Sequence, residues 1–249
     1  MLSDVEASLA FSMGPFAHGR NNERFFDFVL LLQNFAQNDK GEWRRRNMTI
    51  SAVLLAGGES RRMGRDKATI VFGGELLWQR QIELLRGLRP ERVFVSARQK
   101  PSWLPLDTEL LLDDPPSRGP LSGLTRALER TQTSHLVALA VDMPFITAEQ
   151  LHVLCSLAGN GCGVVPLIGE RAEPLAAIYP REAGSDFSAA LASDDFSLQR
   201  LSRNLVDGGK LRIVQVSPED AGLYESVNEP EDLKEGRFPN RPPRNVGGL

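Results

Sequence analysis

The sequence has little of several features that mark particular classes of protein. It contains only two cysteines, Cys155 and Cys162, which cannot form a disulfide framework and do not form a C-x-x-C metal or redox pair. Its 29 Lys plus Arg nearly balance its 32 Asp plus Glu, and the net charge of −3 gives no general electrostatic reason to bind nucleic acid. We therefore expect a cytoplasmic protein with reduced thiols and no affinity for nucleic acid.

Long apolar runs are also missing. The most apolar stretch near the N-terminus covers residues 25–32 and is interrupted by Asp27, whereas a membrane-spanning helix needs about 20 apolar residues. No small-residue cleavage site follows this stretch, so it also makes a poor secretory signal. We expect no association with a membrane.

Regular alternation of strand and helix patterns begins only after Met48. We expect residues 1–48 to lie outside the domain, either as a flexible extension or as a gene-model artefact upstream of a true start at Met48. Residues 237–249 are rich in Pro, Gly and Arg and are predicted to form a disordered tail. The remaining residues, 49–236, suit one α/β domain.

Short apolar runs alternate with amphipathic stretches inside this domain. Residues 50–56 and 135–141 are typical of buried strands, and the apolar residues of 76–88 recur at roughly helical spacing. The alternation predicts a single Rossmann-like three-layer domain, with a mainly parallel sheet and helices on both faces. Ligands of such sheets bind beyond the carboxyl ends of the strands. The loops to examine are therefore 56–68, 97–102, 113–123 and 142–147.

The first of these loops is rich in glycine and positive charge. It reads Leu55-Ala-Gly-Gly-Glu-Ser-Arg-Arg-Met-Gly-Arg-Asp-Lys67. Glycines bring backbone N–H groups close to an anion and the cations balance its charge, which predicts a phosphate site. The loop is not a Walker loop, because Gly58 and Gly64 enclose five residues and Arg65 follows; it is not G-x-G-x-x-G either. The alternative is a solvated glycine turn with incidental charges.

The loop resembles the signature L-A-G-G-x-S-x-R-M-G-x-D-K of the molybdenum cofactor guanylyltransferases, within the nucleotidyltransferase superfamily. Further motifs of that family follow in order: Gly119-Pro-Leu-Ser-Gly123, Val141-Asp-Met-Pro144, Glu173-Pro-Leu175 and Val227-Asn-Glu-Pro-Glu-Asp-Leu233. The resemblance covers about residues 50–235. It implies a fold of the nucleotide-diphospho-sugar transferase type and transfer of GMP from GTP to molybdopterin, with release of pyrophosphate. It also implies partner proteins that deliver the cofactor and molybdoenzymes that receive it.

The candidate catalytic residues are Lys67, Arg62 and Asp142. Asp142 follows a buried strand and would place a carboxylate at the sheet edge, where Mg²⁺ bridging phosphates would bind, although it could instead cap the following turn. The resemblance assigns Mg²⁺ to Asp142, and it assigns Lys67 and Arg62 to the phosphates and the reacting centre. No catalytic dyad is expected, because the acceptor phosphate is already anionic and the barrier is mostly charge repulsion and misalignment.

The resemblance also implies two sets of binding residues. For the acceptor pterin these are Arg62, Gly119, Gly123, Ser226 and Asn228; for the nucleotide they are Leu55, Ala56, Gly57, Gly58, Lys67, Ser96, Asp114 and Asp142. Asp113 remains an alternative to Asp114. Ser96 stands where relatives often have Asn, so its contact is expected to be weaker or bridged by water. Gly119 and Gly123 flank a helix start, whose N–H groups could hold an anion.

Two other functions stay open from the sequence. One is another nucleotidyltransferase of this fold, which uses CTP or a sugar phosphate. Gly57, where related cytidylyltransferases tend to have Ala, leaves space near the base but does not select guanine over adenine. The other is a catalytically silent nucleotide-binding carrier, and intact Lys67 and Asp142 argue against it.

Overall fold

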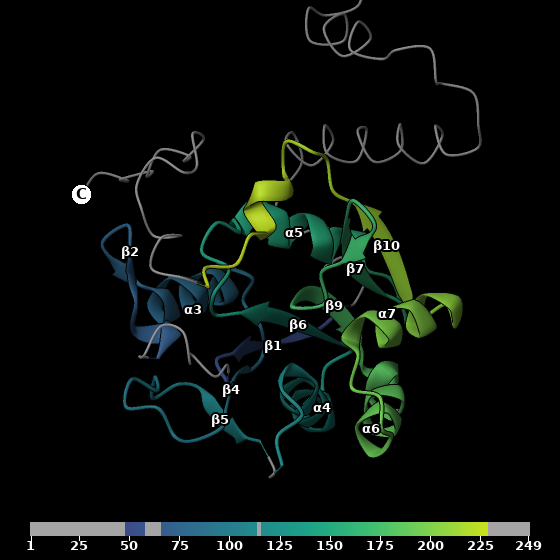
Figure 1. Ribbon diagram of the computed structural model, residues 1–249, viewed down its shortest axis with the longest axis horizontal. Helices are drawn as coiled ribbons and strands as arrows, with labels where there is room; N and C mark the ends of the chain where they lie inside the picture. Colours follow the sequence, from purple (N-terminus) through teal and green to yellow (C-terminus); the bar gives the residue numbers. More distant parts are fainter. Residues whose placement is uncertain (1–47, 58–65, 114–115, 229–249) are drawn as a thin grey trace, which may run out of the picture. The chain divides into compact units, whose positions relative to one another are not determined.

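The computed structural model describes residues 48–57, 66–113 and 116–228, and every structural statement below refers to these ranges (Figure 1). They form an eight-stranded sheet with the order β10-β7-β9-β6-β1-β4-β5, and β8 pairs with β7. The strands are β1 (Ile50–Leu55), β4 (Val93–Ala97), β5 (Glu109–Leu112), β6 (His135–Ala140), β7 (Gly163–Ile168), β8 (Arg171–Ala172), β9 (Ala176–Pro180) and β10 (Leu211–Gln215). A separate hairpin consists of β2 (Val71–Phe72) and β3 (Glu75–Leu76).

The sheet is mainly parallel, as predicted. Strands β6, β1, β4 and β5 run in the same direction, and so do β7 and β10. β9 is antiparallel to its neighbours β6 and β7. The chain between β7 and β9 is too short for a parallel crossover, which needs about a dozen residues or more, so β9 has to reverse direction.

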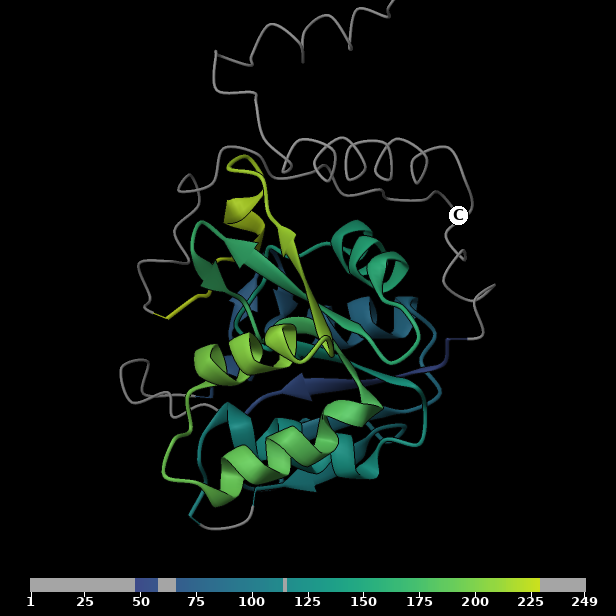
Figure 2. The same cartoon turned by 90° about the vertical axis from the view of Figure 1, so that its right-hand side faces the viewer.

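Helices cover both faces of the sheet and complete the three predicted layers. They are α3 (Leu77–Gly87), α4 (Pro120–Arg130), α5 (Ala148–Leu157), α6 (Gly184–Ala192) and α7 (Leu198–Asp207). The turn η2 (Lys67–Thr69), η3 (Arg181–Ala183) and η4 (Ala221–Tyr224) are 3-10 helices. Helices α3 and α5 pack together on one face, and α4, α6 and α7 on the other; Figure 2 shows β1 between the two helix layers.

The alternation of side chains along β1 explains why both faces are covered. Val53 and Leu55 belong to the core cluster with Leu124 of α4. Ala52 and Leu54 point to the opposite face, because successive side chains of a strand alternate, and both are fully buried. A strand buried on both faces reads as a continuous apolar run, which is why the sequence pattern identified it.

The predicted N-terminal extension and C-terminal tail fall almost entirely outside the described residues. Met48, the last residue before the predicted domain, is 8% exposed. The rest of the extension and the whole predicted tail lie outside the described residues. No helix among those described is long and apolar enough to cross a membrane.

His135, the first residue of β6, is a buried titratable group far from the predicted site loops. The residue is 1% exposed, with Nδ1 3.0 Å from Ser134 Oγ and Nε2 3.4 Å from the Cys162 carbonyl oxygen. Burial lowers the pKa of His135 below its usual value, and the carbonyls of Cys162 and Gly159 and the charge of Glu182 oppose that shift. An unfolded histidine has a pKa of about 6.5. As the pH falls, His135 therefore takes up a proton in the unfolded chain at a higher pH than in the folded protein.

We expect the free energy of unfolding to fall between about pH 7.5 and about pH 5.5 through His135. Above the unfolded pKa the imidazole is neutral in both states, so its contribution is constant there. The contribution of His135 to the free energy of unfolding is lost as the pH falls from the pKa of the unfolded histidine to the lower pKa of His135 in the folded protein. Urea denaturation at the two pH values measures this loss, and His135→Gln should lose less stability than the wild type. Equal losses in the two proteins would contradict the assignment.

Candidate functional site

The site lies at the carboxyl edge of strands β6, β1, β4 and β5. In the sheet register, Leu55 at the end of β1 is level with Ala140 of β6 and Ser96 of β4. Strand β4, which follows β1 along the chain in the parallel set, pairs with one edge of β1, and the later strand β6 pairs with its other edge. Strand order therefore reverses at β1, and open α/β sheets bind ligands at such a switch point.

Three motifs that are distant in the sequence meet at Lys67. The Lys67 ammonium contacts Asp142 Oδ2 at 2.7 Å and donates to Asn228 Oδ1 at 2.8 Å. The backbone N–H of Val227 donates to the Asp142 carbonyl at 2.8 Å and ties the C-terminal motif to this loop. The side chains of Lys67 and Asp142 are 15% and 21% exposed, so the ion pair is shielded but reachable. A cation and a carboxylate thus stand side by side at the sheet edge.

The donor chemistry of this edge suits a magnesium ion that is shared with a substrate. Within the described ranges, no group of three or more His, Cys, Asp or Glu side chains could enclose a metal ion by itself. Mg²⁺ is commonly held by one or two carboxylates together with substrate phosphates and water. Asp142 therefore fits as one ligand of an ion that a bound nucleotide would complete.

Helix α3 supports the loop that carries Asp142, which the sequence did not predict. Gln81 Nε2 donates to the Met143 carbonyl at 2.5 Å, and Arg80 Nε donates to the Pro144 carbonyl at 2.7 Å. Gln81 is fully buried, and a polar side chain on the apolar face of a helix was the only signal for it. These two bonds fix the backbone directly after Asp142.

A second carboxylate, Asp113, stands at the other end of the site. It follows β5 and is 9% exposed. Ser117 donates to its Oδ2 at 2.7 Å, and Ser96 is 3.4 Å from its Oδ1. A Cβ atom on Gly57 would come within 3.6 Å of Asp113 Oδ2, so this carboxylate faces the start of the signature loop. The structure thus brings Asp113 to the site, and Asp114 lies outside the described residues.

Ser96 and Gly123 pack closely against each other where α4 approaches the sheet. Ser96 is 3% exposed, and a Cβ atom on Gly123 would lie 2.2 Å from Ser96 Oγ and 3.1 Å from Leu55 Cδ2. Glycine at 123 is therefore required for the close approach of α4 to β1 and β4. Ser96 is enclosed by α4 and bonded to Asp113, so it supports that carboxylate rather than facing open space.

Gly119 shapes the turn before α4. It caps the helix with φ 66° and ψ −145°, a conformation that favours glycine, and Pro120 begins the helix. Its N–H donates to Ser117 Oγ at 3.2 Å. The turn therefore links the helix start to Ser117, which in turn holds Asp113.

Some of the other predicted site residues lie within the described ranges and some lie outside them. Ala56 uses its N–H in the sheet, where it donates to the Ser96 carbonyl at 2.9 Å, and Ser226 accepts from Asn228 Nδ2 through its carbonyl at 3.4 Å. Leu55 is buried in the core. The predicted residues Gly58 and Arg62 lie outside the described ranges.

The Glu173-Pro-Leu175 motif forms a partly buried turn near Asp142. Burial raises the pKa of Glu173; the Leu175 N–H and the charge of Arg171 lower it, and the charge of Asp142 raises it further. The Leu175 N–H donates to Glu173 Oε1 at 3.1 Å, and the Tyr179 hydroxyl donates to the Pro174 carbonyl at 2.7 Å. These contacts shape the connection into β9.

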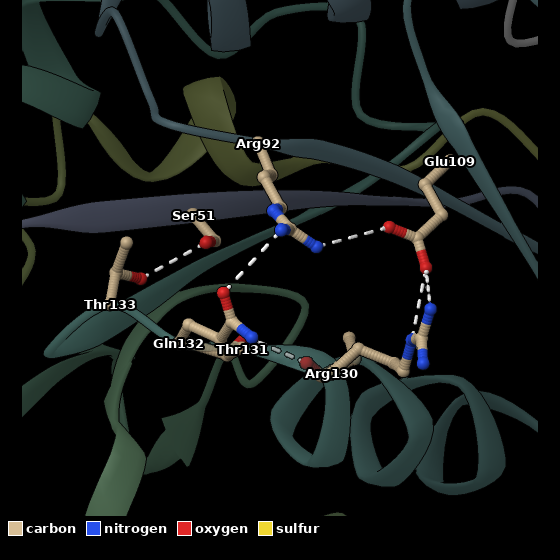
Figure 3. A network of polar contacts seen from close by, with 8 residues as sticks. Ser51, Arg92, Glu109, Arg130, Thr131, Gln132 and Thr133 are labelled. Carbon is tan, nitrogen blue, oxygen red and sulfur yellow. Dashed lines mark hydrogen bonds and ion pairs between the residues drawn. The ribbon is translucent and has the colours of Figure 1, made fainter.

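A separate polar network lies at the opposite, amino edge of the sheet (Figure 3). Glu109 accepts from Arg130 Nε and Nη2 at 2.9 and 2.6 Å and lies 3.6 Å from Arg92 Nη1. Thr133 Oγ1 donates to Ser51 Oγ at 3.0 Å. Because these residues stand at the amino ends of strands and the end of α4, the network is remote from the site.

Comparison with known proteins agrees with this geometry. The model of the MobA-like NTP transferase domain matches residues 52–209. A probable molybdenum cofactor guanylyltransferase of Opitutus terrae is 37% identical over 186 residues, which cover 74% of this chain and 92% of that protein. A molybdenum cofactor guanylyltransferase of Cereibacter sphaeroides is 32% identical over 191 residues, covering 75% of this chain and 94% of the relative.

The fold has counterparts among solved structures. The molybdopterin-guanine dinucleotide biosynthesis protein A of Archaeoglobus fulgidus superposes with a TM-score of 0.59 at 21% identity, over 74% of this chain and 94% of that one. At this identity the structure supports the fold alone, whereas the domain match and the relatives above 30% identity support the family. The chain therefore belongs to the MobA-like NTP transferase family.

Proposed function

We propose that this protein transfers GMP from GTP to molybdopterin and forms molybdopterin guanine dinucleotide. The observation that carries the proposal is the contact of Lys67 with Asp142 and Asn228, which unites three motifs at the switch point of the sheet. The names of the relatives, which include molybdenum cofactor guanylyltransferase, supply the substrate class. The reaction takes place in the cytoplasm, with proteins that deliver the pterin and molybdoenzymes that receive the product.

The proposed chemistry is a single displacement at phosphorus. An oxygen of the terminal phosphate of molybdopterin attacks the α-phosphorus of GTP, and the bond to the β-phosphate oxygen breaks to release pyrophosphate. Asp142 would hold a Mg²⁺ ion, which supplies positive charge next to the phosphates when it is bound. The Lys67 ammonium neutralises charge that develops on the transferred group, and its position beside Asp142 brings it to the same phosphates. Arg62 is proposed to add a second cation.

The guanine base is proposed to lie at the Asp113 end of the site. Asp142 and Asp113 follow β6 and β5, the outer strands of the parallel set, so a nucleotide with phosphates at Asp142 extends across β1 and β4 toward Asp113. A carboxylate is an acceptor at both oxygens. Guanine presents two neighbouring donors, N1–H and the 2-amino group, and Asp113 would bind both.

Asp113→Asn is expected to lower kcat/KM for GTP by about 10- to 100-fold and to improve relative turnover of xanthosine triphosphate. The reason is that an amide offers one acceptor and one donor, which match the N1–H and the 2-carbonyl oxygen of xanthine. Steady-state kinetics with both nucleotides measure the change. The control is Asp107→Asn, because Asp107 is exposed and paired with Arg86 outside the site. Unchanged GTP preference in Asp113→Asn would refute the base contact.

Pyrophosphate release, assayed with each nucleoside triphosphate in the presence and absence of molybdopterin, tests the function as a whole. We expect release with GTP that depends on molybdopterin. Faster release with CTP would refute the guanylyl assignment and favour a cytidylyltransferase. Release that requires a sugar phosphate instead of molybdopterin would show that the acceptor is a sugar phosphate. Nucleotide binding without release of pyrophosphate would favour a catalytically silent carrier.

A further inference from the structure

A pair of stacked indoles connects the chain after β4 to the turn that carries Lys67. Trp103 lies between β4 and β5, and its ring stacks on Trp78 of α3 with centroids 5.3 Å apart and planes 14° apart. Trp103 Nε1 donates to Asp66 Oδ2 at 2.8 Å. We call Trp78, Trp103 and Asp66 the tryptophan strap, because together they tie three separate segments at one point.

Asp66 stands directly before Lys67 and uses both of its carboxylate oxygens. Oδ1 accepts from the Ala68 N–H at 2.9 Å and caps the turn η2, and Oδ2 accepts from Trp103. The cap sets the backbone of the turn, whereas Trp103 fixes the carboxylate from the side. A rotation of Asp66 would move the Lys67 backbone, and with it the ammonium that lies 2.7 Å from Asp142.

The two indoles of the strap have different roles. Trp78 Nε1 is buried and has no hydrogen-bond partner in the part of the chain that the structure describes. Trp78 therefore supplies a surface for stacking, and the polar contact comes from Trp103. Stacked aromatic rings restrict each other's orientation, and a phenyl ring at position 78 would still offer this face, whereas the hydrogen bond to Asp66 comes from Trp103.

We infer that Trp103 is a positioning residue, which holds Asp66 and thereby keeps Lys67 aligned with the phosphates of the nucleotide. The inference rests on the proposed nucleotidyl transfer and adds to it a residue outside the charged centre. A hydrogen bond to a carboxylate is short and strong compared with one between neutral groups. Because catalysis here depends on alignment of charge, even a small displacement of Lys67 should slow the reaction.

Two substitutions remove the same hydrogen bond from opposite ends. Trp103→Phe keeps an aromatic ring on Trp78 and loses the N–H, while Asp66→Ser keeps an oxygen that can cap η2 but is too short to reach Trp103. Each is expected to lower kcat/KM for GTP by about tenfold. The double variant should lose no more than about the larger single loss, because both changes break one bond. Wild-type rates in Trp103→Phe, or additive losses, would overturn the inference.

Trp78→Phe is the matched control. It makes the same chemical change in the other member of the stack, but the indole N–H that it removes bonds to nothing among the described residues. We expect kcat/KM to stay within about twofold of the wild type. A tenfold loss in this control would show that the bulk of the stack matters rather than the bond to Asp66, and the inference would fail.

A spectroscopic measurement separates this inference from the proposed function. The chain has three tryptophans, so a ¹H–¹⁵N spectrum should contain three indole N–H resonances, and Trp103→Phe identifies the one that belongs to Trp103. Asp66→Ser should shift that resonance, speed its exchange with water and leave the Trp78 resonance in place. An unmoved Trp103 resonance overturns the strap. A wild type that shows this bond but no turnover with GTP overturns the guanylyl proposal instead.

Discussion

Asp142→Asn is expected to reduce Mg²⁺-dependent release of pyrophosphate from GTP by about a thousandfold, while the protein remains folded. Asn keeps the shape of Asp and can still accept a hydrogen bond from Lys67, but it lacks the negative charge that a magnesium ion requires. The side chain is partly exposed and its ion pair contributes little to stability, so the free energy of unfolding should change by no more than about 1 kcal/mol. Steady-state pyrophosphate release and urea denaturation measure the two quantities.

Asp186→Asn provides a control of the same chemistry. Asp186 of α6 pairs with Lys210 at 2.5 Å, and both side chains are about as exposed as a surface pair, at 37% and 32%. This change also removes one carboxylate from a Lys–Asp pair, but at a distance from the carboxyl ends of β1 and β6. We expect wild-type turnover and an unchanged requirement for Mg²⁺. The metal role of Asp142 would be refuted if Asp142→Asn and Asp186→Asn behaved alike.

The proximity of Lys67 and Asp142 could be predicted, because it follows from the order of apolar runs and loops in the sequence. Both residues lie in loops that follow continuous apolar runs, and such runs form buried strands of a parallel sheet. The carboxyl ends of neighbouring parallel strands lie at one edge, so polar groups in the following loops are brought together. The motif order then identified which loops belong to one site.

The antiparallel direction of β9 could not be predicted from the alternation of strand and helix patterns. Alternation of strand and helix patterns predicts a mainly parallel sheet and gives no reason for one strand to run in the opposite direction. Gly169, with φ 59°, lies in a tight turn between β7 and the short strand β8, so the chain reverses before it reaches β9. The length of the connection contained this information, because a parallel crossover requires a helix or a segment of similar length.

The partners of Asp113 could not be predicted, because they depend on distances between side chains. Choosing between Asp113 and Asp114 requires knowing which one points inward, and a one-residue shift in a strand reverses the direction of the side chain. Likewise, Gly123 lies close to Ser96 only because α4 approaches β4, and sequence periodicity does not report how closely a helix and a strand approach. Gln81 and Trp103 were missed for the same reason, since each acts on a backbone or side chain far away in the sequence.

Lys67→Met is expected to lower kcat for GTP by about 100- to 1000-fold, the loss typical when a group that stabilises transition-state charge is removed. Met retains most of the length and apolar surface of the lysine side chain but removes the ammonium that contacts Asp142 and Asn228. Lys210→Met is the matched control, because Lys210 forms a Lys–Asp pair away from the site and should leave kcat unchanged. Equal activity of Lys67→Met and the wild type would refute the catalytic role of Lys67.

The dependence on Mg²⁺ distinguishes the loss in Lys67→Met from the loss in Asp142→Asn. In the structure the Lys67 ammonium forms an ion pair with the Asp142 carboxylate, so it competes with any metal ion for that oxygen. Without the ammonium, Asp142 keeps its charge and loses the competitor. Lys67→Met should therefore keep the enhancement of GTP binding by Mg²⁺ while it turns over slowly, whereas Asp142→Asn should lose that enhancement. Calorimetric titration with and without Mg²⁺ tests this; weakened metal-dependent binding in Lys67→Met would show that lysine supports the metal site instead of acting on the phosphates.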